Sequence, residues 1–199
     1  MPFKAIDKKT GEVVLSTLFA EALTIRAKYS DLVCPACKAR VSARGGKSMR
    51  IVPHFFHIRK EGEGCLIADK HKSRRSLTHH TLMVKSAYDY LIKEIPPGFT
   101  LDFEHHSKAV PDRIADLAVL DANGNMVQAH EIQLTKVPVR QLEERTESYE
   151  SAGVEVVWWF GKGCDTEEII NWSRANFGYC IMPEISFFNQ ESTFMEVDE

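Results

Sequence analysis

One segment decides the fold: residues 115–133, which read ADLAVLDANGNMVQAHEIQ. Asn123-Gly124 lies between two runs of strand-forming residues, and this dipeptide is typical of a two-residue type I′ hairpin turn. Residues paired across such a turn share one face of the sheet, with Cβ atoms about 4.5–5.5 Å apart. The turn therefore predicts that Asp116 faces Glu131 directly. On the same face it predicts Gln133 and the pairs Ala118–Ala129 and Leu120–Val127.

The predicted pairing sets two carboxylates against each other. Like charges directly opposite one another destabilise a sheet, and a buried carboxylate pair needs a proton or a cation. Hard oxygen ligands suit Mg²⁺ or Mn²⁺, so Asp116 and Glu131 are candidate ligands of a catalytic divalent ion. The alternative is an exposed face on which both acids are merely solvated. The apolar residues of that face, and the helix–strand pattern that follows it, favour a covered sheet and the metal.

Strand and helix patterns continue on both sides of the hairpin. Expected strands cover residues 100–105, 113–120, 126–134, 154–160 and 179–187, and expected helices cover 18–28, 76–95, 138–151 and 166–176. This alternation predicts an α+β or α/β class with a mixed sheet flanked by helices. We expect four segments: an N-terminal strand and helix segment over residues 1–30, a basic segment over 31–75, a sheet domain over 76–187 and a frayed acidic tail over 188–199.

The composition excludes several classes of protein. The chain has 199 residues, of which 44% are hydrophobic and 27% charged, and these are ordinary values for a soluble globular protein. No apolar run approaches the roughly 20 residues of a membrane helix, so no membrane partner is expected, and the N-terminus has no secretory pattern. Five cysteines, two of them spaced as Cys34-x-x-Cys37, indicate metal binding rather than disulfides, and therefore a reducing cytoplasm.

Residues 31–75 hold too few aliphatic side chains to form a hydrophobic core alone, so they need a further stabilising element such as a bound metal. Cys34 and Cys37 have the spacing that wraps two thiolates around one tetrahedral zinc. In an extended segment His54 and His57 point to opposite faces, so only one of them ligates easily. We expect a structural zinc bound by Cys34, Cys37, His57 and Cys65. His54 is the alternative to His57, and His71 is a further candidate ligand. The competing interpretation is a set of free thiols and surface imidazoles.

Charge is unevenly spread along the chain, although its net value is only −3. Residues 38–85 carry 12 Lys and Arg against three acids. A basic region between acidic flanks predicts a surface for a polyanion, and hence DNA as a partner; the alternative is a solvated loop. The expected DNA contacts in and beside this region are Arg44, Lys47, Arg50, Arg59, Lys72, Arg74 and Arg75.

A family resemblance joins these observations. The chain carries, in this order, Cys34-x-x-Cys37, His54-Phe55-Phe56-His57, Ser76-x-x-His79, Arg113-Ile114-Ala115-Asp116, Glu131-Ile132-Gln133, Leu142-x-x-Arg145-x-x-x-Tyr149 and Trp158-Trp159. This series resembles the competence protein CoiA family over most of residues 30–162. The resemblance implies a zinc-ribbon-like segment followed by a nuclease domain of the PD-(D/E)XK, restriction-endonuclease-like superfamily.

The resemblance also implies roles for single residues. Asp116 and Glu131 match the metal-binding acids, and Gln133 stands where many relatives have Lys. Glu104, on the strand before Asp116, is a candidate for a third acid. Arg145 could face DNA phosphates from its helix or pair with a neighbouring acid such as Glu144.

Two functions of different class follow from the resemblance. The first is a Mg²⁺- or Mn²⁺-dependent DNA nuclease that processes incoming or foreign DNA, with recombination or DNA-uptake proteins as further partners. The second is a non-catalytic, zinc-containing DNA-binding or adaptor protein that keeps the fold. Gln133 in place of Lys favours the second, whereas the intact pair of Asp116 and Glu131 favours the first.

Overall fold

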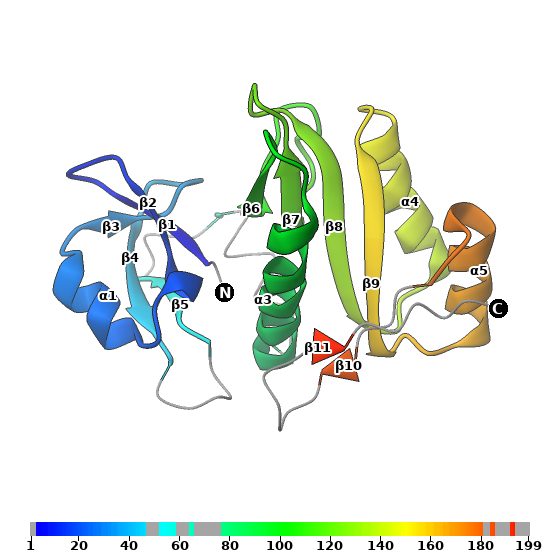
Figure 1. Ribbon diagram of the computed structural model, residues 1–199, viewed down its shortest axis with the longest axis horizontal. Coiled ribbons are helices and arrows are strands. Elements are labelled where there is room, and N and C mark those ends of the chain that lie inside the picture. The colour runs from blue at the N-terminus through cyan, green and yellow to red at the C-terminus, as the bar shows by residue number, and fades with distance from the viewer. Residues whose placement is uncertain are drawn as a thin grey trace. The chain divides into compact units, whose positions relative to one another are not determined.

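The structure is a computed structural model of the whole chain, shown in Figure 1. It describes residues 3–46, 52–58, 64–65 and 77–180, together with the short strands β10 (Glu184–Ile185) and β11 (Ser192–Thr193). The chain divides into two compact units, Met1–Leu82 and Met83–Glu199, and the division falls inside one helix. The four segments expected from the sequence stay predictions.

The first unit is built on an antiparallel sheet of five strands in the order β2-β1-β3-β4-β5. Its elements are β1 (Lys4–Asp7), β2 (Val13–Leu15), the 3-10 helix η1 (Ser16–Leu18), α1 (Ala22–Lys28), β3 (Leu32–Val33), β4 (Arg40–Arg44) and β5 (His54–His57). The helix expected over residues 18–28 is confirmed over Ala22–Lys28, but its expected beginning at residue 18 is wrong. Extended backbone at Phe19 and Glu21 separates η1 from α1.

The second unit is a four-stranded mixed sheet in the order β6-β7-β8-β9. Helix α3 (Leu77–Glu94) belongs to this unit from Met83 onward. The further elements are β6 (Thr100–His105), β7 (Ala115–Leu120), β8 (Met126–Thr135), α4 (Val139–Glu150), β9 (Glu155–Gly163) and α5 (Glu167–Phe177). Strands β6, β7 and β8 are antiparallel neighbours, whereas β9 runs parallel to β8 after the crossover through α4. This is the mixed sheet flanked by helices that the sequence predicts.

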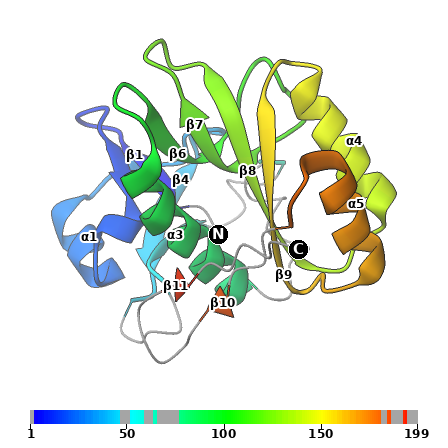
Figure 2. The same ribbon diagram turned by 45° about the vertical axis from the view of Figure 1, so that its right-hand side comes forward.

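Helices cover both faces of this sheet. Helix α3 lies on one face, and α4 and α5 lie on the other (Figures 1 and 2). On the α3 face Phe103 stacks on Tyr88, with ring centroids 4.4 Å apart. Beneath α4 and α5, Leu142 and Trp172 belong to the main hydrophobic cluster. Because both faces are covered, polar side chains of the central strands are taken out of water.

The hairpin between β7 and β8 differs from the predicted turn. Gly124, with φ of 80°, closes a three-residue loop in which its N–H donates to the Asp121 carbonyl at 2.9 Å. The Asp121 carboxylate accepts the N–H groups of Asn123 and Asn125, at 2.9 and 2.8 Å, and this favours a type I turn followed by a left-handed glycine. The two-residue type I′ turn is therefore wrong.

A bulge restores the predicted register below the turn. Leu120 pairs with Met126 rather than Val127, but the register then shifts by one residue, and Ala118 pairs with Ala129 as predicted. Val127 is the extra residue on β8. The turn and the bulge thus compensate for each other, and the strand segments further down have the expected alignment.

Within the described residues, no helix combines the length and the apolar character that crossing a membrane requires.

Candidate functional site

Four side chains of the first unit form a compact group, here called the cysteine cluster. The Sγ atoms of Cys34, Cys37 and Cys65 and a ring nitrogen of His57 all lie within 4.8 Å of one another. The two sulfurs of Cys34 and Cys65 are 3.8 Å apart, and Cys37 Sγ lies 3.3 Å from His57 Nε2. Around a tetrahedral zinc these edges would be about 3.8 Å and 3.6 Å. A Cys₃His set of this size could therefore hold zinc.

Local backbone geometry builds the first half of the cysteine cluster. Cys34 directly follows β3, and its N–H donates to the carbonyl of Ala39 at 2.8 Å, closing a loop in which Lys38 has φ of 61°. The N–H groups of Cys37 and Ala36 bond the Cys34 thiol and favour its ionised form, whereas burial raises its pKa to about 12. A cation beside the sulfur would reverse this effect of burial.

The structure distinguishes the two candidate histidines. His54 is buried, its Nδ1 donates to the Val52 carbonyl at 2.8 Å, and its Nε2 accepts from the Nε of Arg44 at 2.8 Å. Both of its ring nitrogens are thus used outside the cysteine cluster. His57, at the end of β5, contributes instead, and burial lowers its pKa, which favours the neutral form that a metal requires. His71 lies outside the described residues.

Three acids of the second unit occupy aligned positions on neighbouring strands, here called the carboxylate row. Leu117 pairs with His130 on β8 and with Phe103 on β6. One step along the strands, Asp116 therefore falls opposite Glu131 and opposite Glu104. All three acids are buried, with 1%, 1% and 4% of their surface exposed, respectively. The alignment of Asp116 with Glu131 is the one that the sequence predicts.

Two acids of the carboxylate row, Asp116 and Glu131, lie on the face of the sheet beneath α4. Glu131 pairs with Trp158 of β9, and Trp158 packs in the cluster that α4 and α5 cover. The backbone N–H of Ile132 donates to Asp116 Oδ2 at 2.9 Å, which ties β8 to the carboxylate on β7. Glu104 has φ of 46°, a left-handed conformation that is rare for a residue with a side chain and marks local backbone strain.

Glu131 has two partners on α4. Tyr149 donates its hydroxyl to Glu131 Oε1 at 2.6 Å, and the guanidinium of Arg145 forms an ion pair with Oε2. Arg145 also donates to Gln133 Oε1 at 3.2 Å and lies over the ring of Trp158, 4.5 Å from its centroid. Burial and the charge of Glu131 raise the pKa of Tyr149, so this phenol stays protonated and acts as a donor.

These contacts change the electrostatic argument made from the sequence. The expectation that only a divalent ion makes the acid pair tolerable omits Arg145, which supplies a positive charge next to Glu131. Within the described part of the chain, the cysteine cluster is the one group of three or more His, Cys, Asp or Glu side chains placed closely enough to hold a metal together; the three acids of the carboxylate row do not all come that close to one another. The oxygens of the carboxylate row suit Mg²⁺ or Mn²⁺ by their chemistry, but an ion on Glu131 would be repelled by the positive charge of Arg145.

The predicted DNA contacts are described only in part. Arg44 is exposed on β4, and its guanidinium lies 5.1 Å from the ring centroid of Phe56. Arg145 pairs with Glu131 rather than with Glu144. The other residues predicted to contact DNA lie outside the described residues: Lys47, Arg50, Arg59, Lys72, Arg74 and Arg75.

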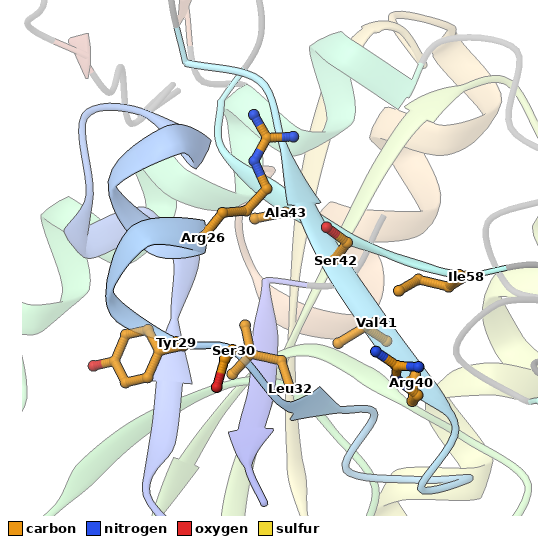
Figure 3. A pocket seen from close by; sticks show the side chains of 9 residues that line it. All are labelled: Arg26, Tyr29, Ser30, Leu32, Arg40, Val41, Ser42, Ala43 and Ile58. Atoms are coloured by element: carbon orange, nitrogen blue, oxygen red, sulfur yellow. The ribbon is translucent and has the colours of Figure 1, made fainter.

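A pocket of about 230 Å³ in the first unit was missed by the sequence analysis (Figure 3). Arg26 of α1 and Arg40 of β4 lie towards its opposite ends, with Ser42 between them along the strand. The signal for it is the alternation of β4, in which Arg40, Ser42 and Arg44 alternate with buried Val41 and Ala43.

Comparison with known proteins identifies the second unit. A search of the curated proteins finds no match. The family model described as competence protein CoiA, nuclease-like domain, matches residues 78–189, which is more than half of the chain. The matched residues hold the mixed sheet and the carboxylate row, and the motifs that suggested this family from the sequence lie largely on these elements. The chain therefore belongs to the competence protein CoiA family, through its nuclease-like domain.

Proposed function

We propose that this protein is a Mg²⁺- or Mn²⁺-dependent DNA nuclease. The observation that carries the proposal is the alignment of the carboxylate row, Glu104, Asp116 and Glu131, on three neighbouring buried strands of a nuclease-like domain. Natural sheets avoid aligned, buried like charges unless they have a use. Asp116 and Glu131 are proposed as the metal ligands, with Glu104 as the third acid and Gln133 as a further catalytic residue.

The side chains of the site define what each could contribute. A divalent ion held by Asp116 and Glu131 would stabilise the phosphate charge and lower the pKa of a bound water. Asp116 is fixed by the N–H of Ile132, so it presents a preorganised carboxylate. Gln133 has neither charge nor basicity, so it can only orient the water or donate to a phosphate oxygen. Tyr149 holds Glu131 by its hydroxyl and sets the position of that acid.

A structural zinc in the cysteine cluster is the second part of the proposal. Two edges of the Cys₃His set, 3.8 and 3.3 Å, are close to those of a tetrahedral zinc site, and the set joins the β3–β4 loop to the end of β5 and to Cys65. Closed four-ligand sites of this kind stabilise small domains rather than catalyse reactions. No disulfide joins the five cysteines, all of which are described, and this fits a reducing compartment such as the cytoplasm.

A second candidate function is a DNA-binding or adaptor protein without turnover. The observation that favours it is the pairing of Glu131 with Arg145 and Tyr149, which satisfies this acid without a metal. Gln133, in place of a cationic Lys, favours it too. Both candidates have DNA as partner, and recombination or DNA-uptake proteins would act with either.

A cleavage assay separates the two candidates. Purified protein with Mn²⁺ or Mg²⁺ is expected to cut single-stranded, duplex or branched DNA, and Asp116→Asn is expected to lower the rate at least about 10³-fold because it removes a metal ligand. Asp112→Asn is the matched control, since Asp112 is an exposed acid in the turn that precedes β7. If wild type and Asp116→Asn bind DNA with equal affinity and neither cleaves any substrate, the nuclease function is excluded. The adaptor function then remains.

A further inference from the structure

Arg145 places its positive charge beside Glu131, where a divalent ion bound by this acid would place its own. Glu131 is buried, and its two oxygens are used by Tyr149 and Arg145. The guanidinium is held in place by Gln133 and by the face of Trp158 as well. The free protein therefore compensates Glu131 internally. A divalent ion and the Arg145 guanidinium carry like charges, and on one carboxylate they repel each other, so metal binding and the Arg145–Glu131 pair weaken each other.

A guanidinium that leaves Glu131 needs a new anionic partner. Its planar fork matches phosphate geometry with two parallel hydrogen bonds, as it matches a carboxylate. One fifth of the Arg145 side chain is exposed, whereas Glu131 is almost fully buried, so the Arg145 side of the pair is the side open to solvent. A DNA phosphate arriving at that side would offer Arg145 a replacement for Glu131.

We propose that Arg145 exchanges between Glu131 in the free protein and a DNA phosphate in the complex, so that DNA and divalent metal bind cooperatively. This inference rests on the proposed nuclease function, because it concerns the same acids. Linkage requires that the coupling is reciprocal: DNA tightens the metal by the same factor as the metal tightens DNA. Without DNA, the metal has to compete with Arg145 and binds weakly.

The test measures Mn²⁺ affinity by titration calorimetry, with and without a phosphorothioate-protected oligonucleotide, in single-stranded and duplex forms. For the wild type, DNA is expected to tighten Mn²⁺ binding by about 5- to 150-fold, the usual range of such couplings. Arg145→Gln should bind Mn²⁺ more tightly than wild type without DNA, and DNA should no longer change that affinity. Arg140→Gln is the matched control, because Arg140 forms an exposed pair with Glu144 on the same helix.

The outcomes separate the exchange from the nuclease function. Mn²⁺-dependent cleavage with no effect of DNA on Mn²⁺ affinity would overturn the exchange alone. Failure of every form to bind Mn²⁺ would overturn both. Arg145→Lys guards against loss of the fold, since it keeps the charge but not the fork; its coupling should lie between those of the wild type and Arg145→Gln. If DNA tightened Mn²⁺ binding in both Arg145→Lys and Arg145→Gln by the same factor as in the wild type, the exchange would be contradicted.

A separate observation concerns the pocket between α1 and β4. Arg26 and Arg40 line it, and within the described ranges neither guanidinium has an ion-pair or hydrogen-bond partner. Ser30 and Ser42 add hydroxyl groups, and Val41 is among its apolar lining residues (Figure 3). Two uncompensated guanidinium groups at one pocket attract a ligand with more than one negative charge. The apolar lining suits the sugar or base of a nucleotide rather than an inorganic ion.

We infer that this pocket binds the backbone of single-stranded DNA, with one phosphate on Arg26 and another on Arg40. This contact joins Arg40, which belongs to the basic segment 38–85, to Arg26, which lies before that segment. The pocket belongs wholly to the first unit, so this inference stands apart from the catalytic acids.

The test is the binding of a labelled 20-nucleotide single strand at several salt concentrations. Arg26→Gln combined with Arg40→Gln should weaken binding roughly tenfold at low salt and reduce the salt slope by about 1.4, the value for two phosphate contacts on single strands. Lys8→Gln with Lys162→Gln removes the same charge from exposed positions outside the pocket and should change both far less. Equal losses of affinity and of salt slope in the two double variants would overturn the assignment. Binding of inorganic phosphate by the pocket, without any contribution to the binding of the strand, would overturn it too.

Discussion

Incubation with a strong chelator is expected to unfold the first unit while the sheet of the second unit stays folded. The cysteine cluster ties β3, β4 and β5 together where the chain has few aliphatic side chains. Structural zinc contributes roughly 10–16 kcal/mol in small zinc-dependent domains, which is as much as the whole stability of most domains. Cys34→Ser should have the same effect. Hydrogen exchange, followed by mass spectrometry over residues 3–46 and 83–180, measures the two units separately.

The control for this prediction is another buried thiol. Cys164 is buried in the second unit, where its thiol donates to the Gln133 carbonyl at 3.2 Å, and it lies outside the cysteine cluster. Cys164→Ser should leave the exchange of residues 3–46 unchanged. A purified chain that contains no zinc, and whose exchange pattern is identical with and without chelator, would show that the cluster is a set of packed thiols.

Glu131→Ala is expected to abolish metal-dependent cleavage and also to destabilise the metal-free protein. Breaking a buried ion pair by removing one partner typically costs about 3–5 kcal/mol, because the other charge is left uncompensated. Here the remaining groups are Arg145 and the Tyr149 hydroxyl. Urea unfolding in chelator, beside the cleavage assay, measures both effects.

Glu144→Ala is the matched control for this variant. Glu144, the residue before Arg145 on α4, forms an exposed pair with Arg140, and such pairs contribute about 0–1 kcal/mol. The like-charge argument from the sequence predicts the opposite sign for Glu131→Ala, because removing one of two facing acids relieves repulsion. Equal or greater stability of Glu131→Ala without metal would therefore mean that repulsion from Asp116 outweighs the pair with Arg145.

The second unit was predictable because its signals are local. Helix α3 ends just before Pro96-Pro97-Gly98, and the predicted strand 100–105 has the observed bounds. The register of β7 and β8 follows from alternating apolar residues, which fix which face each side chain takes. The cysteine cluster was predictable for the same reason: Cys34-x-x-Cys37 is a spacing within one loop, and the alternation of His54 and His57 selects one histidine.

The contacts that sequence could not provide join elements that are distant in the chain. Arg145 and Tyr149 lie 14 and 18 residues from Glu131, on a helix whose rotation relative to the sheet depends on packing against Trp158. Both residues belong to the motif Leu142-x-x-Arg145-x-x-x-Tyr149. The sequence alone could not decide whether Arg145 contacts a DNA phosphate or pairs with an acid. The Arg26–Arg40 pocket depends on the placement of α1 against β4, which no periodicity specifies.

The extra residue Val127 isolates the tip of the β7–β8 hairpin from the acids further along the strands. Because a bulge already absorbs one residue between the loop and Ala118–Ala129, the length of the connection and the alignment of Asp116 with Glu131 are set at different places. Relatives can therefore gain or lose residues at this tip during evolution without rotating the acids to the opposite face. The same position is a natural site for inserting an affinity tag or a fluorophore.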